Sequence, residues 1–201
     1  MAAKELPQTT IVIGDLGLTK DHPDQYAVRV LNYILGGGGF NSRMMREIRS
    51  NRGLAYSAYS YFQVGRRLPG PFIAGTETKN VSVAPAITLT REIMVDLKDN
   101  LVTEEELQLA KESQINSFVF GFENTHSVVN RQMSMAFFGY PQDYLARYRD
   151  RIAAVTVADV QRAAREFIDL SRQQIVLVGN PEEFRKDLAE FGLPIVDVDL
   201  D

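Results

Sequence analysis

The sequence predicts an α+β fold in which helices pack on one mixed or antiparallel sheet. Runs of β-type residues lie near both ends of the chain, at 9–13 and 174–179, and two more lie between them, at 54–64 and 72–78. Most of the helical patterns fall between this central pair and the last strand. This order of elements is typical of helices layered on a sheet.

The first strand leads into a helix through turn and helix-start residues at 14–24. The apolar residues that follow recur at helical spacing, so that one face of the helix would turn toward a core. These residues are Ala27, Val30, Leu31, Ile34 and Leu35. Gly36 is predicted to end the helix, because glycine is common just past a helix end.

A short helix and a hairpin are predicted next. Apolar residues within 40–52 have helical spacing, and arginines occupy the wetter sides. The segment 54–64 is rich in tyrosine and other β-forming residues, and 72–78 returns as a second strand. The turn residues at 66–71 predict an antiparallel hairpin whose loop is longer than two residues.

Helical patterns fill most of the second half of the chain. An apolar stripe over 83–97 predicts one helix, and Thr103 with Glu106 has the form of a capping box that opens another. A further pattern at 125–138 runs through Val128, Val129, Met133 and Phe137. The remaining helical patterns lie at 144–152 and 156–167.

The C-terminal part is predicted to hold a strand and a helix. The strand at 174–179 is followed by Asn180 and Pro181, which have the form of a helix cap and a first turn. They predict a last helix through Phe184 and Leu188. Residues 194–198 are expected to form one more strand or an extended tail.

Composition bounds the class of protein. With 201 residues, 45% hydrophobic and 24% charged, the chain is typical of a soluble globular protein, and we expect a single α+β domain over residues 1–201. A net charge of −4 gives no electrostatic reason to expect nucleic acid or an anionic membrane as partner. No apolar run approaches the roughly 20 residues of a membrane helix. The abrupt start suggests a domain from a longer protein.

Common catalytic motifs are missing from the sequence. The two histidines, His22 and His126, lie far apart, and neither belongs to H-E-x-x-H or H-x-x-E-H, so we expect no zinc site in this chain. There is no cysteine and no G-x-S-x-G nucleophile. The glycines at 36–39 lack the lysine of a phosphate-binding loop. By themselves they indicate only a helix end and a flexible loop.

The residues around these glycines carry a resemblance to a known family. The run from Gly36 to Arg49, then 52–58, resembles the C-terminal half of the pitrilysin/insulinase-type metallopeptidases, which include mitochondrial processing peptidase and its bacterial relatives. Residues 32–37 and 103–107 look like the same family. The resemblance implies two homologous halves that close around an extended peptide, of which only one holds zinc in the inverted H-x-x-E-H motif. This sequence looks like the zinc-free half.

The resemblance also implies site residues. In the family, the zinc-free half contributes an arginine and a tyrosine, and the segment 48–56 matches their pattern at Arg49 and Tyr56. A guanidinium suits a substrate carbonyl, and a phenol can donate to a developing oxyanion. The glycines Gly36, Gly37, Gly38 and Gly39, with Phe40, resemble a substrate-binding loop. The strands at 56–61 and 72–78 are expected to offer an edge to which a peptide adds.

The resemblance therefore predicts the substrate-binding half of a zinc metallopeptidase, inactive as an isolated chain. No cofactor is expected here; zinc would lie in the partner half, in the same polypeptide or in a separate subunit. The other partners would be the peptide substrate and, in isolation, further copies of this chain. A soluble protein of the bacterial cytoplasm or periplasm is expected. The alternatives are a non-catalytic structural or peptide-binding subunit of the same fold and an unrelated α+β domain.

Overall fold

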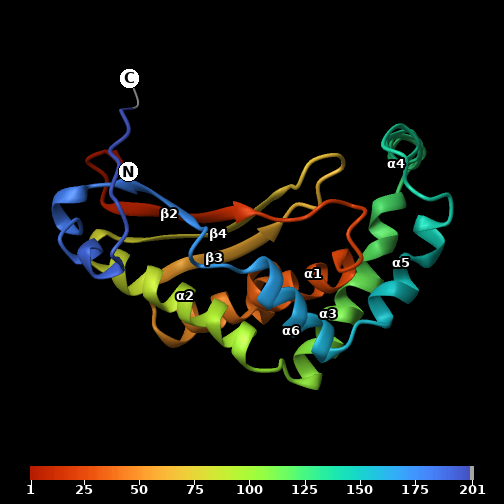
Figure 1. Cartoon of the computed structure of the whole chain (residues 1–201), viewed down its shortest axis with the longest axis horizontal. Coiled ribbons are helices and arrows are strands. Elements are labelled where there is room, and N and C mark those ends of the chain that lie inside the picture. Colours follow the sequence, from red (N-terminus) through yellow and green to blue (C-terminus); the bar gives the residue numbers. More distant parts are fainter. Residues whose placement is uncertain (200–201) are drawn as a thin grey trace.

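The computed structural model describes residues 1–199 and confirms the α+β fold, with helices packed on a mixed sheet (Figure 1). In this part of the chain the sheet has five strands in the order β1-β5-β2-β4-β3. The strands span Ala2–Ala3 (β1), Gln8–Leu16 (β2), Ala55–Phe62 (β3), Pro71–Lys79 (β4) and Gln174–Gly179 (β5). β1 is parallel to β5, and the other neighbours are antiparallel.

The strand order decides which strand offers an edge. β3 is the last strand of the sheet and has β4 as its neighbour on one side only. β4 lies between β2 and β3, so the expectation that it also offers an edge is wrong: both of its hydrogen-bonding sides are occupied. Of the two strands of the hairpin, only β3 lies at an edge of the sheet.

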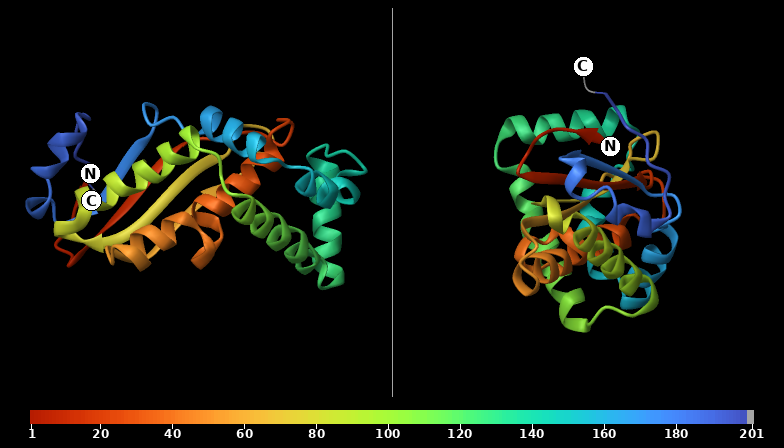
Figure 2. Two further views of the ribbon diagram at one scale, coloured as in Figure 1. Left: turned by 90° about the horizontal axis from the view of Figure 1, so that it is seen from below. Right: turned by 90° about the vertical axis from the view of Figure 1, so that its left-hand side faces the viewer.

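The helices cover one face of the sheet. They span Gln25–Asn32 (α1), Val83–Asp99 (α2), Glu104–Ser117 (α3), Thr125–Phe137 (α4), Tyr144–Ala153 (α5) and Val157–Phe167 (α6). α1, α2 and α6 lie below the sheet in Figure 1, and α3, α4 and α5 gather at one end. Figure 2 shows the same layers from two further sides. No helix within residues 1–199 is both long and apolar enough to cross a membrane.

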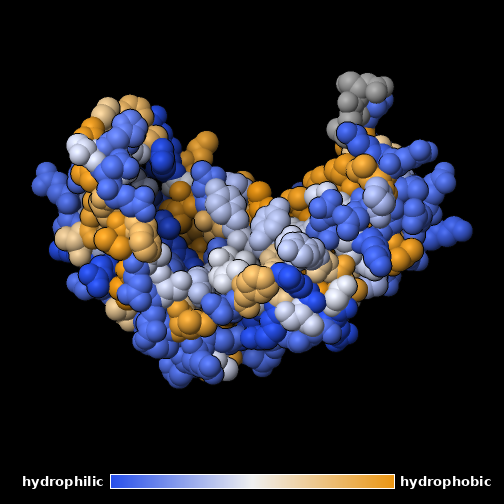
Figure 3. Space-filling model, turned by 180° about the vertical axis from the view of Figure 1, so that it is seen from behind, coloured by the Kyte–Doolittle hydropathy of each residue, from blue (hydrophilic) through white to orange (hydrophobic). Residues whose placement is uncertain are grey.

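The opposite face of the sheet is open and forms the floor of a concave surface. α4 rises at one end of this surface and the C-terminal segment at the other (Figures 1 and 3). Along β2, the side chains of Ile11 and Ile13 are buried against the helices, whereas Thr10 before them is exposed and Val12 between them is partly buried. This alternation is typical of a sheet with one solvated face.

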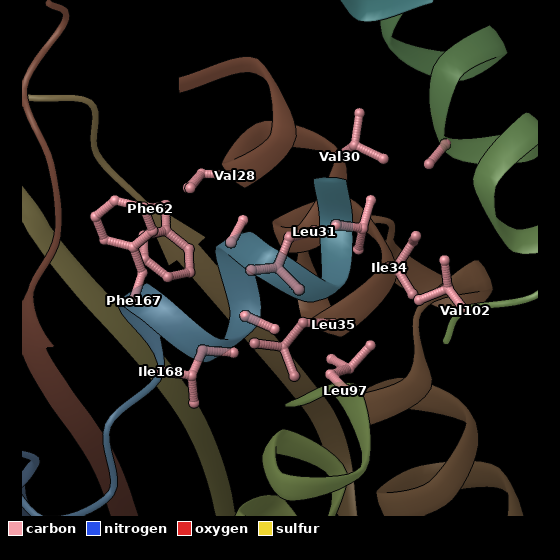
Figure 4. Close-up of a cluster of buried hydrophobic side chains, with 14 of the residues drawn as sticks. Val28, Val30, Leu31, Ile34, Leu35, Phe62, Leu97, Val102, Phe167 and Ile168 are labelled. Carbon is pink, nitrogen blue, oxygen red and sulfur yellow. The ribbon is translucent and has the colours of Figure 1, made fainter. Parts of the chain in front are cut away.

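The main core lies between the sheet and the helices. Leu31 and Leu35 are fully buried at its centre, where they meet side chains such as Leu97 of α2 and Ile168 just after α6 (Figure 4). The stripe predicted from the sequence of the first helix thus faces the core as expected. A smaller cluster around Ile11 and Phe184 fills the other end of the sheet.

One expectation about a single element needs correction. The predicted last helix is replaced by two short 3₁₀ turns, Pro181–Glu183 and Asp187–Phe191. Residues 194–198 form the extended tail, one of the two expected outcomes, and run beside Met1. Helix α4 forms where its pattern predicted, but none of its residues is buried, and Met133 and Phe137 are more than 60% exposed. Its apolar pattern therefore marks a surface and not a core.

A cluster of ion pairs ties the centre of the chain to α2 and α3. The guanidinium of Arg43 donates two hydrogen bonds to Glu106, at 2.7 and 2.6 Å, and one to Asp96 at 2.6 Å. The Arg43 side chain is only 10% exposed, so these bonds compensate for its loss of water. They fix the short helical turn after Arg43 against two longer helices.

We predict that Glu106→Gln lowers the free energy of unfolding by about 1–3 kcal/mol at pH 7, because Arg43 then keeps only Asp96. Burial alone would raise the pKa of Glu106, but hydrogen bonds from Arg43 and the Thr103 backbone outweigh it and hold the pKa below 4.5. The stabilisation is therefore complete above about pH 5 and is lost as the pH falls through the folded pKa.

Urea unfolding between pH 3 and 7 measures this effect. Glu105→Gln, an exposed neighbour on the same helix, is the matched control and should leave stability and its acid dependence nearly unchanged. Equal effects of the two substitutions would contradict a stabilising role of the ion pair.

Candidate functional site

Arg49, Tyr56 and Phe40 come together at the edge of the sheet. Arg49 lies on a wide helical turn, Met45–Asn51, Tyr56 lies near the start of β3, and Phe40 lies on a short 3₁₀ turn, Gly39–Asn41. The central guanidinium carbon of Arg49 is 4.5 Å from the ring centre of Tyr56 and 4.7 Å from that of Phe40. Both distances are within the range of cation–π contacts.

The polar groups of this cluster are free. Within residues 1–199, the Arg49 guanidinium and the Tyr56 hydroxyl make no hydrogen bond or ion pair with another side chain. The nearby carboxylate of Glu47 bonds instead to Asn51 and Arg46, and these bonds lower its pKa. The cluster can therefore offer hydrogen-bond donors to a bound molecule.

The aromatic rings are exposed. Tyr56 is 81% exposed and Phe40 is 70% exposed, although both are large rings that proteins usually bury. Two exposed rings that both contact one guanidinium group indicate a surface that binds another molecule.

Local backbone geometry aims Tyr56 toward Arg49. Gly53 has a φ of +60°, a value that favours glycine, and it reverses the chain between the helical turn and β3. The pairing of β3 with β4 shifts register between Ala55 and Ala58. Irregularities of this kind turn one side chain away from the regular alternation of a strand.

The glycines before the cluster are packed, contrary to the prediction that they form a flexible loop. α1 does not end at Gly36 but continues as a wide helical turn, Tyr33–Gly37. A Cβ at Gly36 would lie 2.3 Å from the backbone nitrogen of Ser60 in β3. Glycine is needed here so that the helical turn can touch the edge strand. Gly39, with a φ of +57°, is open to solvent, and the substrate contacts of the glycines remain a prediction.

Two tyrosines that the sequence did not single out extend the site along β3. Tyr59 and Tyr61 point to the open face of the sheet and are nearly half exposed. Tyr59 crosses Gly75, its partner on β4, whose Cβ would lie 2.5 Å from the tyrosine hydroxyl. The glycine within a strand was the available signal, because such glycines often mark a close approach.

The described residues contain no metal site. No group of three or more His, Cys, Asp or Glu side chains within 1–199 is arranged to hold an ion. His22 lies 3.3 Å from Glu166 and contacts the ring of Phe167, and His126 contacts Asn130. The residues of this chain thus do not fit a zinc ion.

Comparison with known proteins identifies the family. A model of the peptidase M16 inactive domain matches residues 2–114, more than half of the chain. The chain belongs to the M16 peptidase family. The resemblance found in the sequence is thereby confirmed, including its assignment to the domain without zinc ligands.

Relatives and solved structures agree with this assignment to M16. The chain is 31% identical over 178 residues to an uncharacterized zinc protease of Streptomyces coelicolor, covering 84% of this chain and 36% of that protein. It is 24% identical to a non-peptidase homolog of Helicobacter pylori, over 90% of this chain and 41% of that protein. The M16 inactive domain from Pseudomonas fluorescens superposes with a TM-score of 0.82 at 29% identity, covering 89% of this chain and 43% of that one. The chain thus spans less than half the length of these relatives.

We predict that Gly36→Ala destabilises the M16 domain by about 1–3 kcal/mol, because an added methyl group would collide with the backbone of β3. Gly37→Ala is the matched control: its closest obstacle is the side-chain amide of Asn32, which can turn away at the cost of its hydrogen bond with Ser60, so the loss should be smaller. Thermal unfolding compares the two variants. A Gly37→Ala variant that loses as much stability as Gly36→Ala would contradict the close contact at Gly36.

Proposed function

We propose that this M16 chain is the substrate-binding half of a zinc metallopeptidase, a single domain over residues 1–201 that works with a homologous zinc-bearing half. The observation that carries the proposal is the pairing of Arg49 with Tyr56 at the edge of the sheet, with their donors free. The zinc-bearing half would belong to the same polypeptide or to a separate subunit.

Arg49 and Tyr56 supply donors that peptide hydrolysis needs. The N–H groups of Arg49 would bind a substrate carbonyl and orient the peptide. The hydroxyl of Tyr56 would donate to the carbonyl oxygen of the scissile bond as it gains negative charge. The metal and its activated water would come from the partner half, since no group of residues within 1–199 is arranged to hold a metal ion.

The edge of β3 suits an extended peptide. β3 has no strand partner on its outer side within residues 1–199, but helical turns cover this side at Ala58, whose N–H donates to Met45 Sδ at 3.2 Å, and at Ser60, which packs on Gly36. We propose that a peptide adds through main-chain hydrogen bonds at the end of this edge that holds Tyr56. Phe40 and Tyr56 border this edge, and main-chain bonding does not depend on substrate sequence. We therefore propose a peptide substrate in extended form, with Phe40 and the glycines 36–39 among its contacts.

A non-catalytic subunit of the same fold is the second candidate. It is favoured by the similarity to a Helicobacter pylori protein that is named a non-peptidase homolog. The two candidates differ in the partner half. An H-x-x-E-H motif in the partner supports the peptidase, and its absence supports the structural or peptide-binding role.

We predict that the isolated chain does not hydrolyse peptides. Adding the zinc-bearing half should produce cleavage that a chelator abolishes and added zinc restores. A fluorogenic peptide assay of each half and of the mixture measures this, with a zinc-ligand variant of the partner as control. Chelator-sensitive cleavage by this chain alone would contradict the division of roles.

In the assembled enzyme, Tyr56→Phe should lower kcat by about tenfold or more, because one donor to the developing oxyanion is lost while the ring beside Arg49 remains. Tyr140→Phe, which removes the same hydroxyl beside Lys20 and outside this site, should change kcat by less than about twofold. If the two variants are equally active, Tyr56 has no special role in the reaction.

A further inference from the structure

A pocket of about 270 Å³ lies at the other end of the molecule, where α1, α3, α4 and α5 meet (Figure 1). Arg29, Gln114, Ser117 and Arg131 contribute polar groups to its lining, together with aromatic rings including that of Tyr148. No Asp or Glu lines it. This pocket is separate from the cluster at Arg49 and goes beyond the proposed function.

Two residues that line the pocket hold buried donors without acceptors. The Nε of Arg29 and the Nε2 of Gln114 are buried and have no hydrogen-bond partner in the described part of the chain. Both nitrogens can only donate hydrogen bonds, and a buried donor without an acceptor lowers the stability of the fold. Arg29 also has no carboxylate partner within residues 1–199; its guanidinium lies 5.9 Å from the ring of Tyr148.

Arg131 enters the pocket from α4 and is held in place. Its guanidinium lies 4.8 Å from the ring of Phe122 and donates a long hydrogen bond of 3.5 Å to the carbonyl of Gly121. A Cβ at Gly121 would lie 2.1 Å from Arg131, so glycine is needed for this approach. Arg131 makes no ion pair in the described residues. Two guanidinium groups thus line one pocket without a counter-charge.

A neighbouring pocket, which also includes Tyr144, has cations that pair with carboxylates. There Lys20 pairs with Asp21, and Arg147 pairs with Asp143. Carboxylates of the chain itself thus neutralise two of its cations, whereas Arg151 has no ion pair in the described residues. The contrast indicates that the pocket at Arg29 lacks an anion that the chain does not provide.

We propose that the pocket at Arg29 and Arg131 binds an oxyanion, either a carboxylate or a phosphate. Guanidinium groups match both anions and form strong charge-assisted hydrogen bonds with them. Because Arg29 belongs to the body of the domain and Arg131 to α4, the bound anion also bridges the two. α4 has no buried residue of its own, so the anion fixes a wall of the concave surface to the body.

The test is calorimetric titration of the chain with inorganic phosphate and with succinate, each against chloride at matched ionic strength. Arg29→Gln should weaken binding by about tenfold or more, because it removes a charged donor group. Arg149→Gln removes the same charge from an exposed position on α5 outside the pocket and should change affinity by less than about twofold. Arg131→Gln, on the exposed helix α4, takes the place of Arg29→Gln if that variant fails to fold.

Hydrogen exchange gives a second readout. Saturating anion should slow amide exchange in α4 of the parent chain and not of the Arg131→Gln variant. Binding of phosphate alone identifies a phosphate site, and binding of succinate alone identifies a carboxylate site. The proposal is overturned if neither anion binds more than chloride does, or if the arginine variants bind as tightly as the parent.

Discussion

Contact between the helical turn at Gly36 and the edge strand β3 sets the geometry of the whole candidate site. The missing side chain lets the turn approach the backbone of Ser60, and the Ser60 hydroxyl bonds to Asn32 at 2.8 Å. The segment between Gly36 and Ser60 carries Phe40 and Arg49 and ends in β3, which carries Tyr56. Arg49 and Tyr56 meet because both ends of this segment are fixed.

Ion pairs hold the middle of this segment in place. Arg43 joins it to α2 and α3 through Asp96 and Glu106, and the pair of buried contacts leaves little freedom for the helical turn Met45–Asn51. Arg49 and Tyr56 take no part in these bonds. A rigid support beneath free donors is what a preorganised binding site requires, since the donors need not rearrange when substrate arrives.

Periodicity and capping patterns predicted the elements whose signals are local. The stripe through Leu31 and Leu35, the hairpin and the capping box at Thr103 all appear where the sequence placed them. Features set by tertiary contacts escaped prediction. The packing of Gly36 on Ser60 depends on strand order, and a two-residue strand such as β1 has no pattern of its own. The exposure of α4 also escaped prediction, because an apolar stripe looks the same whether it faces a core or the surface.

Arg49 and Tyr56 were selected through a family resemblance and not through physics alone, because an exposed arginine and a strand tyrosine are common. The structure of this chain assembled with the proposed zinc-bearing half and a non-cleavable peptide is the most direct test of the account. The account predicts the peptide along β3, with the Tyr56 hydroxyl within about 2.6–3.2 Å of the scissile carbonyl oxygen. A peptide bound away from β3, with Tyr56 facing solvent, would contradict it.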